Sequence, residues 1–304
     1  MANRKVGIWM YSNSGGTVIE KKIVDLLKER EIDVVTNLDL RFARGSKGKI
    51  ICNNINMLEL DLFFSYNAGE QTVAQTYMYE TLNRYITTIN SFEAFALSED
   101  KFKSNIALHH AGINTSDFFL CHRERPEYMV EKFREWRKLV FKPVDGWGGN
   151  GMTLLESSQS LDSLMPFLNQ SNMRHIYLER FIDNDFTDFR IDIVDGDFIA
   201  CYGRKANDRE WRTNITSGGS VMLREANDEI VDIAKKAVKA LGMDIAGVDI
   251  LYDREKEEYI VLEVNGIPAF ATPEQEKIGL SFNDKKIHKI VELIDSRTQY
   301  KKIG

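Results

Sequence analysis

Residues 245–253, IAGVDILYD, and residues 259–266, YIVLEVNG, decide the fold of this chain. Both stretches are rich in Val, Ile, Leu and Tyr, and their apolar and polar residues alternate, which favours β-strands. The charged run between them, DREKEE at 253–258, is typical of an exposed connection. Together the three stretches predict an antiparallel hairpin.

The two faces of this hairpin differ in character, because side chains alternate between the faces of a strand. The apolar face is expected to carry Val248, Ile250, Leu262 and Val264. The polar face is expected to carry Asp249, Glu263 and Asn265. A turn centred near Lys256 places Asp249 opposite Glu263.

Two carboxylates in opposite positions repel each other, at a cost of roughly 0.2–1 kcal/mol. A divalent cation would offset that cost. The all-oxygen set of Asp249, Glu263 and Asn265 suits Mg²⁺ bound to phosphates better than Zn²⁺. The alternative is a polar face that only meets water, and the hairpin by itself leaves both interpretations open.

The bulk composition is that of a globular protein with a substantial core. The chain has 304 residues, 43% hydrophobic and 28% charged, enough for two or three domains or one large α/β unit. Its net charge of -6 argues against a nucleic-acid partner. No apolar run approaches the ~20 residues that span a bilayer, and the first apolar stretch is too short for a secretory signal.

The cysteines and histidines suggest neither a disulfide framework nor a nucleophile with a histidine partner. The chain has three widely spaced cysteines, Cys52, Cys121 and Cys201. Their odd number and spacing also argue against a zinc site, so we expect a cytoplasmic protein. The histidines are interpreted as structural or surface residues: His109, His110, His122, His175 and His288.

Strands and helices alternate in the first third of the chain, which predicts a mostly parallel sheet. The expected elements are strands at 5–11, 33–37 and 60–66, and helices from the loop at 12–16 to about residue 30 and at 70–85. The loop at 12–16, SNSGG, lacks the patterns of phosphate and dinucleotide loops. It is interpreted first as a turn of the fold, with ligand contact as the alternative.

The pattern changes from residue 98 onward. Ser98 is expected to cap a helix, because serine is a favoured N-cap residue. Further helices are expected at 126–137, 161–169, 225–241 and 285–293, and strands at 115–121, 138–143, 176–182, 189–194 and 198–204. Residues 145–151, DGWGGNG, contain four glycines in seven residues. A turn does not need so many, so this stretch predicts a mobile flap whose backbone approaches a ligand.

Basic residues collect in this otherwise acidic chain. Lys142 precedes the flap in the strand FKPV and is interpreted as a phosphate contact, or alternatively as a lysine on a wet sheet face. A second group comprises Arg190, Arg204, Lys205, Arg209 and Arg212. Beside a carboxylate-held Mg²⁺, such a group suits phosphates and a second anionic substrate, the alternative being scattered surface charge.

The order and spacing of these motifs resemble the ATP-grasp ligases, and most closely their RimK-like branch, which includes ribosomal-protein glutamate ligases and ligases that add glutamate to cofactors. The similar stretches are SEDK at 98–101, FKPVDGWGGNG at 141–151, YLERFI at 177–182, DFR at 188–190, REWRTN at 209–214, SGG at 217–219, IAGVDIL at 245–251 and LEVN at 262–265. The resemblance implies an α/β chain, α+β in its C-terminal half, with the ATP-grasp fold. It implies an N-terminal parallel-sheet preATP-grasp domain at 1–97, a central subdomain with the flap at 98–179, and a C-terminal subdomain with the metal and substrate site at 180–304.

The resemblance also assigns roles to individual residues. It implies ATP contacts by Lys101, Lys142, Gly146, Trp147, Gly148, Gly149, Asn150, Gly151, Glu179, Arg180, Phe181 and Asp188. It implies that two Mg²⁺ ions, replaceable by Mn²⁺, are held by Asp249, Glu263 and Asn265. Arg190 and Arg204 would bind the acyl phosphate or an amino-acid carboxylate, and Asn214 would lie near the phosphates or the metal.

The implied reaction is attack of a carboxylate on the γ-phosphate of ATP, followed by attack of an amine on the acyl phosphate. An amino acid such as L-glutamate would be added to a small molecule, peptide or protein, by a homo-oligomer without nucleic-acid or membrane partners. The alternatives are D-alanine-ligase-like or carboxylase chemistry, or a non-catalytic ATP-binding regulatory protein. The sequence departs from the family at GIPAF (266–270) and at Lys205, and residues 1–97 match in architecture only.

Overall fold

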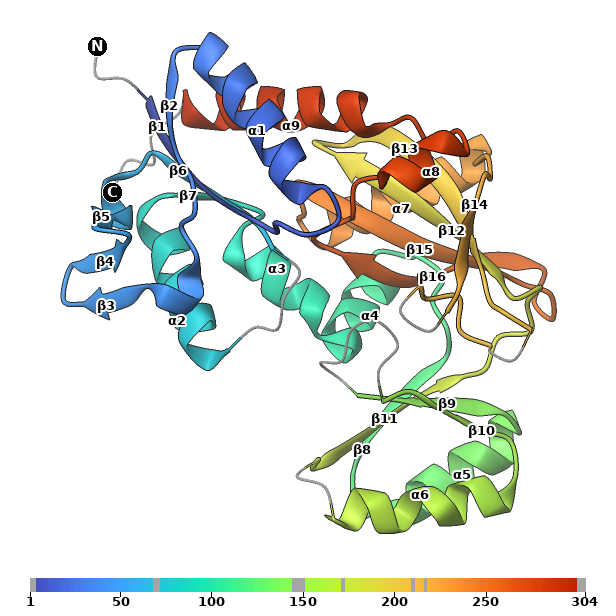
Figure 1. Ribbon diagram of the computed structural model, residues 1–304. Coiled ribbons are helices and arrows are strands. Elements are labelled where there is room, and N and C mark those ends of the chain that lie inside the picture. Colours follow the sequence, from blue (N-terminus) through green and yellow to red (C-terminus); the bar gives the residue numbers. More distant parts are fainter. Residues whose placement is uncertain are drawn as a thin grey trace.

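The structure, a computed structural model, describes residues 4–67, 72–143, 151–170, 173–208, 211–215 and 218–299. Figure 1 shows an N-terminal sheet with its helices, a large sheet beside it, and a smaller sheet that projects below both. This arrangement confirms the predicted α/β class with a parallel N-terminal sheet. None of the helices in these ranges is both long and apolar enough to cross a bilayer.

The N-terminal sheet is parallel, with strand order β2-β1-β6-β7. Its elements are β1 (Arg4–Met10), α1 (Gly16–Glu29), β2 (Ile32–Val35), β6 (Leu62–Tyr66), α2 (Val73–Tyr85) and β7 (Thr87–Ile89). Successive residues of β1 point to opposite faces, so Ile8 packs with α1 and Trp9 packs with α2. The carboxyl end of β6 meets the C-terminal half of the chain, where the hydroxyl of Tyr66 donates to the carbonyl oxygen of Pro268.

A small antiparallel meander between β2 and β6 was not predicted from the sequence. It consists of η1 (Leu40–Phe42), β3 (Arg44–Ser46), β4 (Lys49–Cys52), β5 (Ile55–Asn56) and η2 (Met57–Glu59). Its strands have 3, 4 and 2 residues. Segments this short are hard to recognise, because a period of two needs several residues to show.

The sequence predicted one helix starting at Ser98, but two consecutive helices occupy this region. They are α3 (Phe92–Glu99) and α4 (Lys101–His110). Ser98 is buried near the end of α3, where its hydroxyl donates to the carbonyl oxygen of Phe95 at 2.8 Å. The residue that caps α4 is Asp100, whose carboxylate accepts from the backbone N–H of Lys103 at 3.0 Å. The predicted serine cap is therefore wrong.

The projecting unit is an antiparallel sheet of order β10-β9-β11-β8 with two helices packed on it. It comprises β8 (Phe118–His122), α5 (Pro126–Trp136), β9 (Leu139–Lys142), β10 (Thr153–Leu155), α6 (Ser158–Gln170) and β11 (His175–Arg180). The expected domain boundary after residue 97 falls inside α3, and the one after residue 179 falls at the end of β11. The division into three domains stays a prediction.

The large sheet is antiparallel, with strand order β14-β13-β12-β15-β16. It comprises β12 (Thr187–Val194), β13 (Asp197–Lys205), β14 (Ser220–Met222), β15 (Ile245–Asp253) and β16 (Glu258–Asn265), followed by α8 (Pro273–Lys277) and α9 (Asn283–Thr298). One face packs on α7 (Asp228–Ala240) through apolar residues such as Ile191 and Val248. The other face looks toward the N-terminal sheet and α9, which pack together in one core.

The hairpin predicted from 245–266 is confirmed, and Asp249 pairs with Glu263 as expected. The predicted apolar face is correct except at Leu262. A bulge follows the Asp249–Glu263 pair, so that Ile250 pairs with Val261 and Leu262 is the extra residue. Leu262 therefore packs on the side opposite to Val264.

Candidate active site

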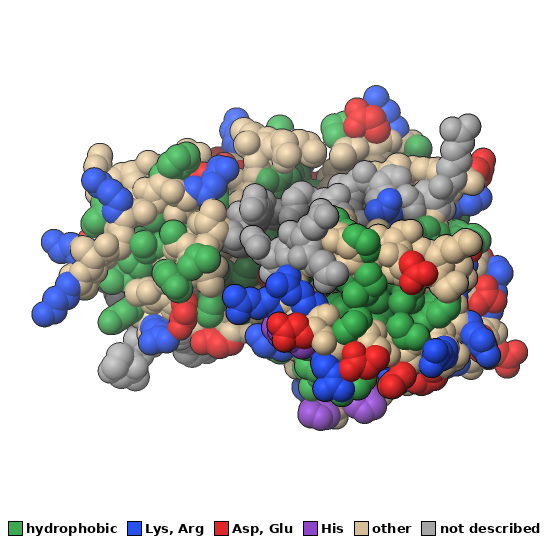
Figure 2. Space-filling model, turned by 90° about the horizontal axis from the view of Figure 1, so that it is seen from below, with side chains coloured by type: hydrophobic (Ala, Val, Ile, Leu, Met, Phe, Trp, Pro, Cys, Tyr) green, Lys and Arg blue, Asp and Glu red, His purple; other side chains and the backbone are tan. Residues whose placement is uncertain are grey.

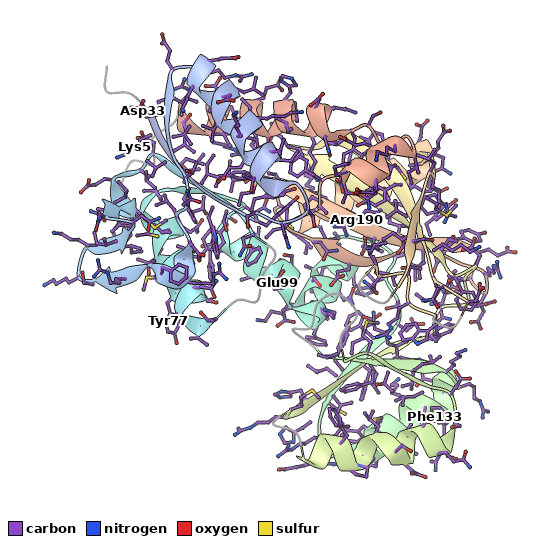
Figure 3. All side chains as sticks on the ribbon, in the orientation of Figure 1. Lys5, Asp33, Tyr77, Glu99, Phe133 and Arg190 are labelled. Atoms are coloured by element: carbon purple, nitrogen blue, oxygen red, sulfur yellow. The ribbon has the colours of Figure 1, made fainter. Side chains whose placement is uncertain are left out.

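Five charged side chains form a charged face on the side of the large sheet opposite α7. They are Asp188, Arg190 and Asp192 from β12, Arg204 from β13 and Asp249 from β15. The β12 residues share a face because they are two apart. The register places Arg204 opposite Asp188, and Asp249 opposite Arg190. Figure 3 shows Arg190 in the interior, where the large sheet meets the N-terminal elements.

Arg190 and Arg204 both bind Asp249. The distance from Nη1 of Arg190 to Oδ1 of Asp249 is 2.7 Å, and that from Nη2 of Arg204 to Oδ2 is 2.8 Å. Arg204 also reaches Asp188 at 2.7 Å. Burial by itself raises the pKa of the Asp249 carboxyl, but the two guanidinium groups outweigh it and hold that pKa below its usual value. The Asp249 carboxylate is therefore held in its ionised form between two guanidinium groups.

Gly247 makes room for this arrangement, because a Cβ atom there would lie 2.3 Å from Nε of Arg190. The glycine pairs with Asp192 of β12, two residue pairs along from the Arg190–Asp249 pair and on the same face of the sheet. Any larger side chain would displace the guanidinium. The GVD stretch of the hairpin thus supplies both the space for Arg190 and its carboxylate partner.

Of the predicted metal-binding side chains, Asp249 belongs to the charged face, and Glu263 and Asn265 lie at its edge. Glu263 is partly exposed, and its Oε1 is 3.4 Å from Nζ of Lys101 at the start of α4. Asn265 donates its amide to Oδ2 of Asp249 at 3.4 Å. Carboxylate and amide oxygens from adjacent strands form a donor set that fits Mg²⁺. In the described ranges, no three His, Cys, Asp or Glu side chains gather as a metal cluster, so this set depends on the asparagine.

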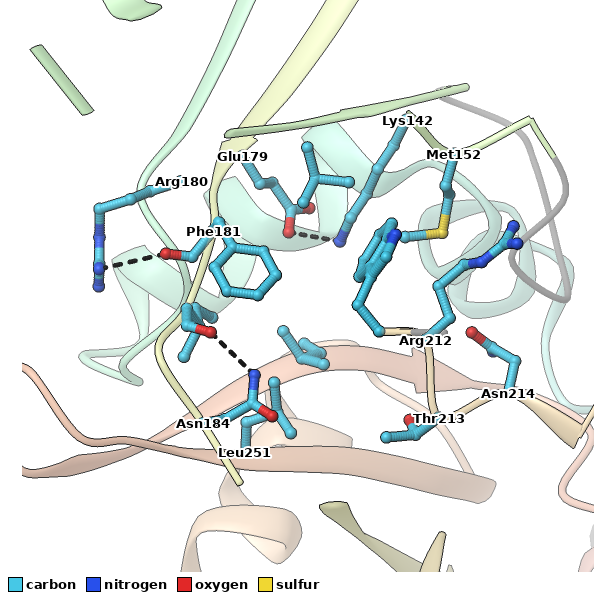
Figure 4. Close-up of a pocket in the computed structure, with 14 residues that line it drawn as sticks. Lys142, Met152, Glu179, Arg180, Phe181, Asn184, Arg212, Thr213, Asn214 and Leu251 are labelled. Atoms are coloured by element: carbon cyan, nitrogen blue, oxygen red, sulfur yellow. Dashed lines mark hydrogen bonds and ion pairs between the residues drawn. The ribbon is translucent and has the colours of Figure 1, made fainter. Parts of the chain in front are cut away.

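A pocket lies beside this edge, between the projecting sheet and the hairpin (Figure 4). Its walls are mostly apolar and include Val140, Met152, Phe181, Ile182, Trp211, Leu251 and Leu262. Its polar lining residues include Lys142, Glu179, Asn184, Thr213 and Asn214. Apolar walls with a few polar groups suit a flat heteroaromatic ligand such as a nucleobase. We call it the apolar pocket.

Lys142 and Glu179 form a buried ion pair in the apolar pocket, drawn as a dashed line in Figure 4. Glu179 is fixed from two further sides, since the hydroxyls of Ser116 and Tyr177 each donate to it at 2.9 Å. Burial and the nearby Glu179 carboxylate raise the pKa of Tyr177 above its usual value, so this hydroxyl stays a donor. Asn105 donates in turn to the Tyr177 oxygen at 2.7 Å.

The side chain of Arg180 points away from the pocket, while the Phe181 ring points into it (Figure 4). Arg180 forms ion pairs with Asp117, Asp253 and Glu255, and so joins β11 to the turn of the hairpin. Only the backbone of Arg180 is then available to a ligand in the pocket. This distinction between side chain and backbone has no signal in the sequence.

The other predicted site residues divide into three groups. Asp188 is buried and binds Arg204 and the hydroxyl of Thr213, while Asn214 lines the apolar pocket. Gly151 has a φ of +72°, which favours glycine. The remaining flap residues and one basic residue lie outside the described ranges: Gly146, Trp147, Gly148, Gly149, Asn150 and Arg209.

Sequence reasoning missed several residues of this region. Met152, Leu251 and Trp211 line the pocket, but each reads as an ordinary apolar residue in the sequence. Asp192 was also missed, although its spacing of two from Arg190 could have placed it on the same face. Asp188, Asp249 and Glu179 were predicted as site residues, but not as the ion-pair partners of the basic residues.

The face shown in Figure 2 carries acidic and basic side chains side by side rather than one basic surface. The fold places the protein in the ATP-grasp class. The chain belongs to the RimK-like ATP-grasp family, whose model matches residues 98–290. It is therefore an ATP-grasp carboxylate–amine ligase.

Similar proteins agree with this assignment. The tetrahydromethanopterin:alpha-L-glutamate ligase of Methanocaldococcus jannaschii is 29% identical over 251 residues, which are 78% of this chain and 81% of that protein. A "Probable alpha-L-glutamate ligase" of Haemophilus influenzae is 31% identical over 181 residues, which are 59% of each chain. The crystal structure of a RimK domain ATP-grasp protein from Sphaerobacter thermophilus shares the fold at a TM-score of 0.70 and 13% identity, covering 97% of this chain and 98% of that one.

Proposed function

We propose that this ligase activates a substrate carboxylate with ATP and joins it to the amine of an amino acid such as L-glutamate. The observation that carries the proposal is the buried contact of Arg190 and Arg204 with Asp249 beside the apolar pocket. Two fixed guanidinium groups offer planar N–H donors to a carboxylate or an acyl phosphate. The names of the methanogen and Haemophilus proteins support glutamate as the amino acid.

ATP would bind with its adenine in the apolar pocket, against Phe181 and Trp211. The ion pair with Glu179 fixes Lys142 at the pocket wall, and Lys101 lies near Glu263, so the two ammonium groups are suited to the phosphates. Asp249, Glu263 and Asn265 would hold Mg²⁺, as two ions replaceable by Mn²⁺, and this metal would neutralise and orient phosphate oxygens. The flap at 146–151 would cover the phosphates.

The chemical steps need little covalent work from the protein. The substrate carboxylate attacks the γ-phosphorus of ATP, ADP leaves, and a mixed anhydride with phosphate is formed. The amine then attacks the acyl carbon, and phosphate leaves with the electron pair of the C–O bond. Arg190 and Arg204 would stabilise the charge on the phosphoryl and carboxyl oxygens, because buried fixed donors need no reorganisation. The amine must reach the acyl carbon unprotonated, and water must be excluded.

The acceptor is proposed to bear its carboxylate near the carboxyl ends of β1 and β6. Tyr11 and Tyr66 lie there with ring centroids 6.1 Å apart, and Phe270 follows at 5.7 Å from Tyr66. Tyr66 and Phe270 are buried, so Tyr11, which is partly exposed, is the ring of this cluster that would contact an apolar or aromatic part of the acceptor. We favour a small-molecule acceptor over a peptide or protein, because a relative that matches 78% of this chain acts, by its name, on tetrahydromethanopterin. We further propose that the protein is cytoplasmic and forms a homo-oligomer.

The test is a screen for ADP release with mass spectrometry of the products. Purified protein with ATP and Mg²⁺ is offered amino acids in combination with candidate carboxylic acids. We expect ADP in equal amounts to an amide product whose mass equals the sum of both substrates less one water. ADP release that needs no carboxylate, or complete absence of turnover and ATP binding, would contradict the proposal.

A further inference from the structure

Lys286 of α9 is buried, and so is its partner Asp192 of β12, both with 0% of their side chains exposed. Nζ of Lys286 donates to Oδ2 of Asp192 at 2.9 Å, to the carbonyl oxygen of Pro268 at 2.8 Å and to that of Ala269 at 3.0 Å. A lysine ammonium has three N–H donors, and each has an acceptor here. One side chain therefore joins α9, β12 and the loop that follows the hairpin.

That loop, residues 266–271, begins directly after Asn265 and is fixed by several other side chains. Asn90 donates to the carbonyl oxygen of Gly266 at 3.0 Å, and the N–H of Phe270 donates to the hydroxyl of Tyr11 at 3.3 Å. Asn283 bonds both the N–H and the carbonyl oxygen of Ala271. Between these fixed ends, the carbonyl groups of Pro268 and Ala269 depend on Lys286, helped at Pro268 by Tyr66.

The second oxygen of Asp192 faces Arg190. Oδ1 of Asp192 is 3.7 Å from Nε of Arg190, and neither atom has a hydrogen-bond partner in the described part of the chain. Both side chains are more than nine-tenths buried. A charge-assisted N–H···O bond is about 2.7–2.9 Å long, so a shift of roughly 1 Å would close this one. Asp192 thus lies between two cations and extends the charged face to α9.

The geometry points to Lys286 as a positioning residue of the ligase: it fixes the loop 266–271 directly and, through Asp192, the guanidinium of Arg190. In the proposed function, the carboxylate-bearing substrate lies between this loop and Arg190. The Lys286–Asp192 ion pair therefore determines how well that substrate binds. This inference rests on the proposed function. Lys286 is completely buried and does not touch a substrate itself. Its Nζ lies 4.6 Å from the ring centroid of the buried Phe270, which places Lys286 directly against this loop.

A purely structural ion pair would have a different signature. Removal of one partner of a buried pair leaves an uncompensated charge, whereas replacement of both by apolar residues leaves none. Lys286→Met is therefore expected to lower stability, and Lys286→Met with Asp192→Leu is expected to restore it. If the pair only stabilised the fold, substrate binding would recover together with stability in the double variant.

The experiment compares the wild type, Lys286→Met, the double variant and a control. The control is Lys289→Met, which removes a lysine from the same helix that pairs with Asp197 at the periphery. For each protein, KM is measured for ATP, the amino acid and the carboxylate acceptor, along with kcat and the unfolding temperature. Hydrogen exchange of residues 266–271 is measured without substrates.

In the double variant we expect the KM of at least one carboxylate-bearing substrate to rise roughly tenfold, because misplacing a binding group by about 1 Å is costly. The KM for ATP should stay within about twofold, the loop should exchange faster, and Lys289→Met should behave like the wild type. Wild-type kinetics and loop exchange in a stable double variant would overturn the inference. An inactive wild type would instead refute the proposed function, and with it this role for Lys286.

Discussion

The apolar pocket and the charged face lie side by side on the same face of the hairpin, yet they are built by opposite means. The pocket is enclosed by apolar side chains from β9, β15, β16 and the segment that follows β11, with one buried ion pair, Lys142–Glu179. The charged face places Asp188, Arg190, Asp192, Arg204 and Asp249 next to one another. Removal of one apolar side chain from the pocket weakens ligand binding in proportion to the apolar area lost. Removal of one buried charge from the charged face leaves its ion-pair partners without compensation.

The difference indicates which step each region serves. Apolar contact binds the ground state and the transition state of a nucleotide alike, so the pocket should mainly affect KM for ATP. Fixed charges aimed at developing charge lower the barrier of the chemical steps. The following predictions test this division, in order of decreasing expected effect.

The largest effect is expected for Glu263→Gln. Glu263 is partly exposed and its known contact is a lysine at 3.4 Å, so the substitution should hardly change stability. Loss of a metal carboxylate should lower the rate of ADP release by about 10³-fold. ADP release and the Mg²⁺ dependence of turnover measure this. Glu258→Gln, at the other end of β16, is the control; turnover within tenfold of wild type for Glu263→Gln would refute the metal assignment.

A smaller loss is expected for Arg204→Ala, which should lower kcat by about 10²-fold through loss of one buried donor. ATP binding should change little, because Arg204 does not line the apolar pocket. Removal of one partner also leaves Asp188 and Asp249 under-compensated, at a cost of about 3–5 kcal/mol in stability. Steady-state kinetics and urea unfolding measure both effects, with the exposed neighbour Lys205→Ala as the control. A collapse of ATP affinity with unchanged kcat would reverse the roles of the two regions.

On the pocket side, Phe181→Ala should raise KM for ATP about tenfold and leave kcat within about threefold. The ring contributes apolar area to the pocket wall, and loss of part of that area costs about 1–2 kcal/mol. Phe167→Ala, on the exposed side of α6, is the matched control. A drop in kcat at saturating ATP, without a change in KM, would contradict the assignment of this wall to ground-state binding.

The smallest effect is expected for the ion pairs of Asp295 with Arg4 and Arg30, which belong neither to the pocket nor to the charged face. Burial raises the pKa of Asp295, but hydrogen bonds from Arg4 and Arg30 outweigh it and lower that pKa. A lowered pKa stabilises the fold above the unfolded value of about 3.9 and loses this contribution as pH falls through the folded value. Asp295→Asn should therefore reduce the free energy of unfolding by about 1 kcal/mol at pH 6 and by less at pH 3. An equal reduction at both pH values would contradict this.

Much of the architecture could be predicted from local pattern. The alternation in 245–253 and 259–266 predicted the hairpin and the pairing of Asp249 with Glu263, which the structure confirms. The strand and helix pattern of the first third predicted the parallel sheet. Errors occurred where several local interpretations compete: Ser98 resembles a cap but lies inside a helix, and a single bulge moves Leu262 to the other side of the sheet.

The candidate site was predictable as a set of residue types rather than as a set of contacts. Its lysines, arginines and carboxylates were recognisable because their order resembles a known family. Which of these side chains bind one another could not be predicted, because the partners are far apart in the sequence. Lys286 and Asp192 are 94 residues apart, and Arg190 and Asp249 are 59 apart. No local pattern encodes contacts over such separations.

By itself, the sequence determined the secondary structure of the hairpin, the family and the class of reaction, because these depend on the order and periodicity of residues along the chain. Only the tertiary structure decided that Arg190 and Arg204 share Asp249, that Arg180 points away from the pocket, and that Lys286 stands behind the loop after Asn265. The physical reason is that a buried charge must be neutralised by whichever opposite charge the packing of sheets and helices brings within reach. In this protein, that packing brings α9 against the face of the large sheet that carries the charged residues.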